Sequence, residues 1–238
     1  MKNQILLIVI ALLLSIQAFS QCSGLSGGGG GLENDGFNSG VISDSEGNIY
    51  FCGSYQDRAY FGINILTTDR NINEGYFINK YDNLGNLIWS KSLGNMTAYL
   101  DFKPITLIGN NIYITLGVSY FQEGADTINS AQIVLWKLDT TGTLIWRKNY
   151  LCGGPSYSSS IISDGANGVL ITGLFNTSLS LNGIDLYSAN SKAWIAHISE
   201  NGFTQWAKQA TPTVVTSFTI KLSLDFFDFL QRSFPPLH

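Results

Sequence analysis

The chain has 238 residues, and 13 Lys and Arg against 17 Asp and Glu give a formal net charge of -4. Aromatic residues reach 13%, which excludes an intrinsically disordered chain, since such chains combine few aromatic residues with high net charge. The acidic balance excludes the basic surface of a nucleic-acid-binding protein. We therefore expect a folded protein with no nucleic-acid partner.

Residues 1–20 have the pattern of a secretory signal peptide. Lys2 precedes an unbroken apolar run over residues 5–14, and Ala18 and Ser20 are the small residues of a cleavage site. The apolar run is too short for a spanning helix, which needs about 20 apolar residues. We expect cleavage after Ser20 and a secreted or cell-surface protein that meets the membrane only through this signal peptide.

Residues 21–36 are expected to be a Gly-rich linker. The glycine run at 27–31 lacks the Gly-Lys-Ser/Thr of a phosphate loop and is typical of a flexible segment. A lipoprotein with Cys22 at its mature N-terminus is the alternative, although it would need a small residue before the cysteine. Three cysteines give no disulfide framework, but a Cys52–Cys152 bridge stays open as an alternative.

Three segments of the chain align as copies of one unit. Each has a tight turn that ends in Gly, a Trp four residues later, and a Lys two residues after the Trp. The tryptophans recur at intervals of 57 and 60 residues, which indicates an internal repeat. The recurring residues are Gly85, Gly142 and Gly202, Trp89, Trp146 and Trp206, and Lys91, Lys148 and Lys208.

A second matched element precedes each tryptophan. The stretches at 41–53 and 161–173 both end in a glycine, Gly53 and Gly173, whereas the looser middle copy lacks it. Each unit therefore contains four short β-rich runs, and the repeat predicts an all-β fold, a β-propeller-like array of about three four-stranded blades. In the first unit the predicted strands fall near 39–43, 48–54, 75–82 and 86–92.

The expected blade repeats span 37–94, 95–152 and 153–211. Residues 212–238 start a fourth unit, with an alternating strand pattern over 218–226, and then diverge from the other units. Since four to eight blades typically close a propeller, the array is expected to be incomplete and the chain to be a truncated piece of a longer propeller. Its open blade edges would allow self-association.

The recurring residues are predicted to have structural roles. The turns at 82–85, 139–142 and 199–202 would join the third and fourth strands, with Gly at a positive φ. A calcium loop at the first turn is the alternative, but too few carboxylates cluster there. The tryptophans are expected to pack between adjacent blades. His197 occupies the place of Lys80 and Lys137 and is therefore expected to be an ordinary strand residue.

The connections between the second and third strands are predicted to be long, unequal loops. They cover about 55–74, 119–130 and 176–191, and variable loops on a rigid scaffold commonly carry binding sites. Ordinary solvated loops with small hairpins are the alternative. The candidate ligand-facing side chains are Tyr55, Asp57, Arg58, Tyr60, Tyr120, Phe121 and Asp126.

These units resemble the SBBP-type β-propeller repeats of secreted and cell-surface bacterial proteins. The matching stretches are 47–53, 61–66 and 77–91, with 182–186 in the third unit, and the resemblance covers about 39–210. It implies an exported propeller, often within a longer adhesin-like protein, with no common catalytic residues. Residues 137–146 are also similar to the Trp-docking repeat of quinoprotein propellers, which implies a propeller enzyme as an alternative.

No Ser/His/Asp set, metal cluster or phosphate loop stands out in the sequence. We therefore expect no catalytic, cofactor-binding or metal-binding residues and no cofactor. The predicted function is that of a non-catalytic module, not an enzyme, that binds a glycan or a protein at the cell surface. The alternatives are a fragment of a propeller enzyme, quinoprotein-like or a hydrolase, and a structural repeat of a larger adhesin-like surface protein.

Overall fold

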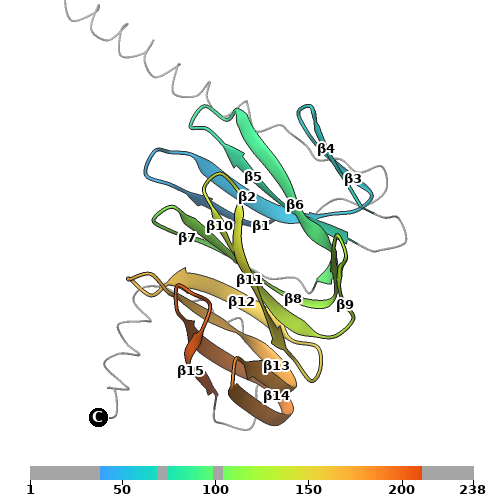
Figure 1. The fold of residues 1–238 in the computed structure, drawn as a ribbon, viewed down its shortest axis with the longest axis vertical. Coiled ribbons are helices and arrows are strands. Elements are labelled where there is room, and N and C mark those ends of the chain that lie inside the picture. Colours follow the sequence, from blue (N-terminus) through green and yellow to red (C-terminus); the bar gives the residue numbers. More distant parts are fainter. Residues whose placement is uncertain (1–37, 69–73, 99–103, 211–238) are drawn as a thin grey trace, which may run out of the picture.

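The computed structural model describes residues 38–68, 74–98 and 104–210. The predicted signal peptide, the Gly-rich linker and the tail at 212–238 lie outside these residues. In the described ranges the chain forms fifteen β-strands and no helix, so the all-β prediction is confirmed (Figure 1). None of these residues forms a helix that could cross a membrane.

The first unit is an antiparallel meander of four strands. Its strands fall on the four ranges predicted from the sequence, which confirms that prediction. The register is set by alternating burial, because successive side chains of a strand point to opposite faces. The strands, in pairing order, are β1 (Asn38–Ser43), β2 (Ile49–Tyr55), β5 (Glu74–Tyr81) and β6 (Leu87–Ala98).

The second unit repeats the same antiparallel order. The end of β6 also pairs with its second strand, between Asn95↔Gln122 and Ala98↔Val118, so the first two units form one nine-stranded sheet. The strands of the second unit are β7 (Ile105–Ile108), β8 (Asn111–Glu123), β10 (Gln132–Asp139) and β11 (Leu144–Leu151), with β9 (Asp126–Ile128) paired to the end of β8.

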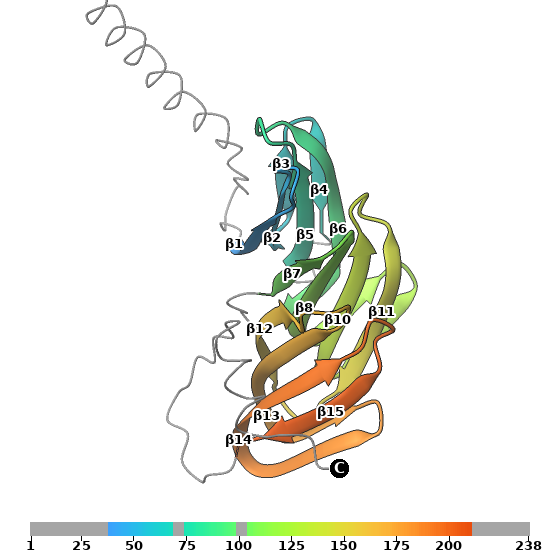
Figure 2. The same cartoon turned by 90° about the vertical axis from the view of Figure 1, so that its left-hand side faces the viewer.

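The third unit is a separate four-stranded sheet with the order β12-β13-β14-β15. Figure 2 shows the three sets of strands following one another along the long axis of the molecule as a curled array. A two-stranded sheet, β3 (Arg58–Phe61) with β4 (Asn64–Thr67), is not paired with the strands of the three units. The strands of the third unit are β12 (Tyr157–Ser163), β13 (Val169–Leu181), β14 (Ile184–Ile198) and β15 (Thr204–Gln209).

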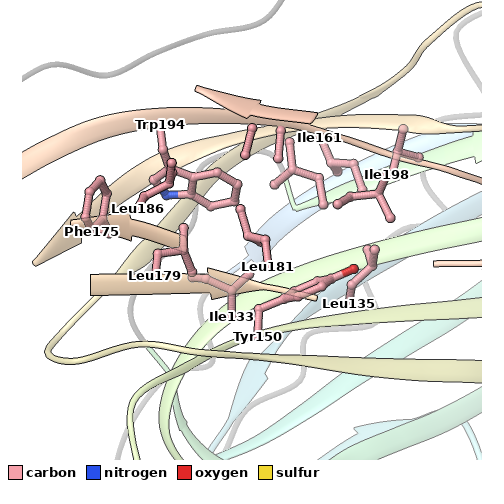
Figure 3. Packing of buried hydrophobic residues seen from close by; sticks show 14 of the residues in the cluster. Ile133, Leu135, Tyr150, Ile161, Phe175, Leu179, Leu181, Leu186, Trp194 and Ile198 are labelled. Atoms are coloured by element: carbon pink, nitrogen blue, oxygen red, sulfur yellow. The ribbon is translucent and has the colours of Figure 1, made fainter. Parts of the chain in front are cut away.

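The hydrophobic core lies at the two junctions between successive units. One cluster joins the first and second units, and another joins the second and third. Strand β10 contributes to both, because Ile133 and Leu135 face one cluster while Val134 and Trp136 face the other. Figure 3 shows the second junction, where Ile133, Leu135 and Tyr150 pack with residues of the third unit such as Trp194. A strand buried on both faces explains the unbroken apolar run of β10.

A tryptophan of each of the first two units donates a hydrogen bond to the turn of the following unit. Trp89 Nε1 donates to the carbonyl of Thr140 at 3.3 Å, and Trp146 Nε1 donates to that of Glu200 at 3.2 Å. Thr140 and Glu200 hold the same place in their turns, so the two contacts are copies of each other. We call this contact the tryptophan–turn contact.

Lysines reinforce each tryptophan–turn contact. Lys80 Nζ donates to the same Thr140 carbonyl at 3.4 Å, and Lys137 Nζ donates to the Glu200 carbonyl at 3.4 Å and to its carboxylate at 3.2 Å. Lys91 Nζ donates to the carbonyl of Gly142. The carbonyls of Thr140 and Glu200 therefore each accept hydrogen bonds from one lysine and one tryptophan, which satisfies backbone groups that the turn itself leaves unpaired.

The turns are shaped to receive these side chains. Gly142 and Gly202 adopt φ angles of 78° and 78°, the left-handed region that glycine enters without strain. A Cβ at Gly142 would lie 3.1 Å from Lys91 Cδ, and one at Gly202 would lie 2.6 Å from Lys148 Cε. Glycine is therefore favoured by the backbone conformation, and it leaves room for the lysine side chain of the preceding unit to pack against the turn.

Replacing Trp146 by Ala should lower the free energy of unfolding by about 3 kcal/mol, because a large ring at a junction is lost. Trp146→Phe keeps most of the ring but loses the N–H donor, and should cost only about 1 kcal/mol. Urea unfolding followed by circular dichroism measures both. Tyr187→Ala, at an exposed position on β14, is the matched control and should change stability little. Equal stability of Trp146→Ala and wild type would contradict the packing role.

Candidate binding surface

The three connections predicted as long loops are β-hairpins. The first is β3–β4, the second pairs the end of β8 with β9, and the third continues β13 into β14. Each turns at a glycine with a positive φ, namely Gly62, Gly124 and Gly183. The expectation of variable loops is therefore wrong for the described part of these connections, and small hairpins, the alternative, are what the structure has. These glycines, flanked by short β-rich runs, are the sequence signal that would have predicted hairpins.

One face of the β3–β4 hairpin packs on the first unit. Ala59 and Phe61 are buried, and the Phe61 ring lies 4.7 Å from the Phe77 ring between centroids. Tyr55 belongs to the same cluster and is buried, with its hydroxyl 3.4 Å from Ser92 Oγ. Its prediction as a ligand-facing residue is therefore wrong, because its ring fills the space between hairpin and sheet.

The opposite face of this hairpin presents large apolar side chains to solvent. Tyr60 and Ile65 are directly paired across the two strands, with exposed fractions of 38% and 56%. Ile63, in the turn between them, is 99% exposed. Alternation explains the pattern, because Ala59 and Phe61 take the inward positions and leave Tyr60 outward. We call Tyr60, Ile63 and Ile65 the apolar hairpin face.

Asp57 and Arg58 lie at the base of the hairpin. Asp57 has a φ of 57°, and its carbonyl accepts a hydrogen bond from Thr68 N at 2.8 Å, which closes the base. The Arg58 side chain is exposed at the start of β3. Both residues therefore stand beside the apolar hairpin face, and the positive φ of Asp57 is one that Asp tolerates better than most residues.

In the second hairpin the candidate residues are largely taken up by local contacts. Phe121 is fully buried, and the Arg147 guanidinium lies 4.6 Å from its ring centroid. Arg147 also forms ion pairs with Glu123 at 2.9 Å and with Asp126 at 3.0 Å. Tyr120 donates a hydrogen bond to Gln122 Oε1 at 3.0 Å. The prediction that Phe121 faces a ligand is therefore wrong, because β8 turns this side chain into the core.

The seven candidate side chains do not converge on one site. Tyr55 and Phe121 belong to two different core clusters, and Asp126 is paired with Arg147. Arg58 and Tyr60 remain as exposed candidates on the β3–β4 hairpin. The sequence did not point to Ile63 and Ile65, because isoleucine carries no polar or reactive group that would suggest a binding residue. They are nevertheless the most exposed side chains of this hairpin face.

The aspartate turns are closed by their own carboxylates. Asp82 accepts hydrogen bonds from the Asn86 side chain and from the backbone N–H groups of Asn86 and Leu84, at 2.8, 2.8 and 2.9 Å. These bonds hold the pKa of Asp82 below its usual value. Asp139 makes the equivalent bonds to Thr141 and Thr143, and its pKa is lowered in the same way. The carboxylates thus act as turn-closing groups.

His197 pairs with an aspartate of the first turn in the third unit. Its Nε2 lies 2.7 Å from Asp164 Oδ2, and its ring lies 5.9 Å from that of Trp206. Burial alone would raise the pKa of Asp164, but hydrogen bonds from Ala166, His197 and Gly168 outweigh it and lower the pKa. His197 is a residue of β14, as the sequence predicts, with a specific partner in place of the turn carbonyl that Lys80 and Lys137 bind.

The two described cysteines are free thiols. Cys52 lies in the cluster between the first two units and Cys152 in the cluster between the last two. Burial raises the pKa of the Cys52 thiol to about 12, and burial also raises that of Cys152. The Cys52–Cys152 bridge left open by the sequence is not formed, and both side chains serve as small core residues.

Within the described ranges, no group of three or more His, Cys, Asp or Glu side chains is placed to hold a metal ion. In comparisons with known proteins, no family model matches the chain, and no curated protein matches it.

Asp164 should contribute to stability at neutral pH and lose that contribution in acid. Its folded-state pKa is lowered, so the unfolded chain binds more protons and stability falls as the pH drops below about 4 and through the folded pKa. Asp164→Asn should therefore be less stable than wild type at pH 7 and should lose less stability between neutral and acid pH. His197→Gln, which keeps the backbone hydrogen bonds to Asp164, should fall between them. Urea unfolding at several pH values measures the difference, and parallel curves for wild type and Asp164→Asn would contradict it.

Proposed function

We propose that this chain is a secreted or cell-surface β-propeller repeat protein, of the kind the SBBP-type repeats represent, that acts as a non-catalytic binding module. The propeller arrangement is supported by the four-stranded antiparallel order that recurs in three units and by the copied tryptophan–turn contacts between them. In such an array each unit corresponds to one blade. The export of the chain rests on the signal-peptide pattern of residues 1–20.

The binding surface in this proposal is the apolar hairpin face. The single observation that carries it is the exposure of Tyr60, Ile63 and Ile65 together on one side of a hairpin whose other side is fixed to the core. Large apolar side chains grouped at the surface mark sites of protein interaction. The hairpin is held at its base by the Thr68–Asp57 hydrogen bond and beside its turn by the buried Phe61–Phe77 pair, so little ordering is needed on binding.

The partner in this proposal is a protein rather than a glycan. The apolar hairpin face offers two isoleucines and one tyrosine, which gain free energy by burial against another apolar surface. A sugar would need several hydrogen-bonding side chains around an aromatic ring. The residue paired directly with Tyr60 is Ile65, and Ile63 follows in the turn, so the centre of this face is apolar and its polar side chains, Arg58 and Thr67, lie toward the base. The exposed Arg58 at its border would add a polar contact at the rim.

The test is the binding of the labelled chain to intact cells of the source organism. Tyr60→Ser/Ile65→Ser should weaken binding by at least about tenfold, because apolar anchors are lost. Ile145→Ser, at an isoleucine of β11 that is 48% exposed, is the matched control and should bind like wild type.

Treatment of the cells separates the two classes of partner. Proteinase treatment should abolish binding, and mild periodate oxidation of glycans should leave it intact. Binding lost on periodate oxidation but kept after proteinase treatment would overturn the protein partner. Equal binding of wild type and the double variant would overturn the apolar hairpin face as the site.

A further inference from the structure

We call the turns at 139–142 and 199–202, which accept the tryptophan–turn contacts, the receiving turns. The first unit has a turn at the same place in the repeat, but no described side chain of another unit covers it. At Gly142 and Gly202, side chains of the preceding unit lie within 3.1 Å of where a Cβ would stand. Gly85 has the same place in its turn and a φ of 83°, yet no atom lies within 4 Å of its Cβ position. The turn at 82–85 is thus a receiving turn without a donor among the described residues.

The third unit has donors that match Trp89 and Trp146 but lack a receiving turn. Trp206 packs in a small apolar cluster with Ile162, Leu170 and Ile195. The side chain of Lys208 is exposed. In the described part of the chain no acceptor meets Trp206 Nε1. The described structure therefore begins with a receiving turn and ends with the donors that such a turn binds.

We propose that a second copy of this chain completes the contact, with Trp206 and Lys208 of one copy bound to the turn at 82–85 of the other. In the expected contact, Trp206 Nε1 donates to the carbonyl of Asn83, as Trp89 and Trp146 do to the equivalent carbonyls at the two internal junctions. Lys208 Nζ donates to the carbonyl of Gly85, as Lys91 does to that of Gly142 at the first junction. The negative charge of Asp82 complements Lys208, as Asp139 complements Lys91 at the first internal junction. His197 contributes no third donor, because it is already paired with Asp164.

The two surfaces differ, so the contact is heterologous. Two copies that close on each other bring together twice the three described units, which falls within the four to eight blades typical of a propeller. This contact between two copies is made by the turn at 82–85 and by Trp206. It differs from the self-association expected from the sequence, which would pair the open strand edges of the blades. It is also separate from the apolar hairpin face, so either proposal can fail without the other.

The test measures the molar mass of the purified full chain by sedimentation over about a hundredfold range of concentration. Wild type should form a dimer as the concentration rises. Gly85→Asn should weaken the dimer at least about tenfold, because Asn tolerates the positive φ while its side chain fills the space that the lysine needs. Gly165→Asn is the matched control, since Gly165 has a φ of 85°, open space around its Cβ position and no place in a receiving turn.

The donor side is tested with Trp206→Phe/Lys208→Met, which should weaken the dimer as strongly as Gly85→Asn. A mixture of this variant with Gly85→Asn should form a one-to-one complex, because each supplies the surface that the other lacks. A wild-type chain that stays monomeric would overturn the proposal. So would a dimer that neither variant weakens, or a mixture that forms no complex.

Discussion

The tryptophan–turn contact is the interaction on which the rest of the structure depends. A tight turn leaves backbone carbonyls without partners, and Trp89 and Trp146 supply the donors from the preceding unit. This single contact explains why the glycine of the turn, the tryptophan and the lysine recur together. It also explains the interval between the tryptophans, since each must reach the turn of the next unit and no other.

The hydrophobic core follows the same arrangement. Because the units contact each other in series, the apolar clusters lie at the junctions, and a middle strand such as β10 is buried on both faces. The hairpins between the second and third strands are attached to this core in different ways. The β3–β4 hairpin packs on a separate cluster, whereas the other two contribute residues such as Phe121 and Leu179 to the junction clusters. Their turns face solvent, and only their inner sides, such as Phe61, are fixed by the core. This separation leaves the outer face of β3–β4 free to differ in chemistry without loss of the fold.

Much of the fold could be predicted from the sequence because its determinants are local. The strands of the first unit follow from alternation, and the turns from Asp and Gly at fixed spacing. The burial of Tyr55 and Phe121 could not be predicted, because it depends on hairpins that fold back onto Phe77 and Arg147 from distant positions. The pairing of β6 with β8 was missed for the same reason. The exposure of Ile63 and Ile65 was hidden because isoleucine in a β-rich run ordinarily indicates core.

The most direct test of the central claim is hydrogen exchange of the receiving turns in Trp146→Phe. This variant removes the N–H that Trp146 donates to the carbonyl of Glu200 in the third unit, and it leaves Trp89 with its contact to Thr140. We expect faster exchange of the backbone amides at 199–203, because their turn loses a donor, and unchanged exchange at 139–142. Unchanged exchange at 199–203, or an equal increase in both turns, would contradict it.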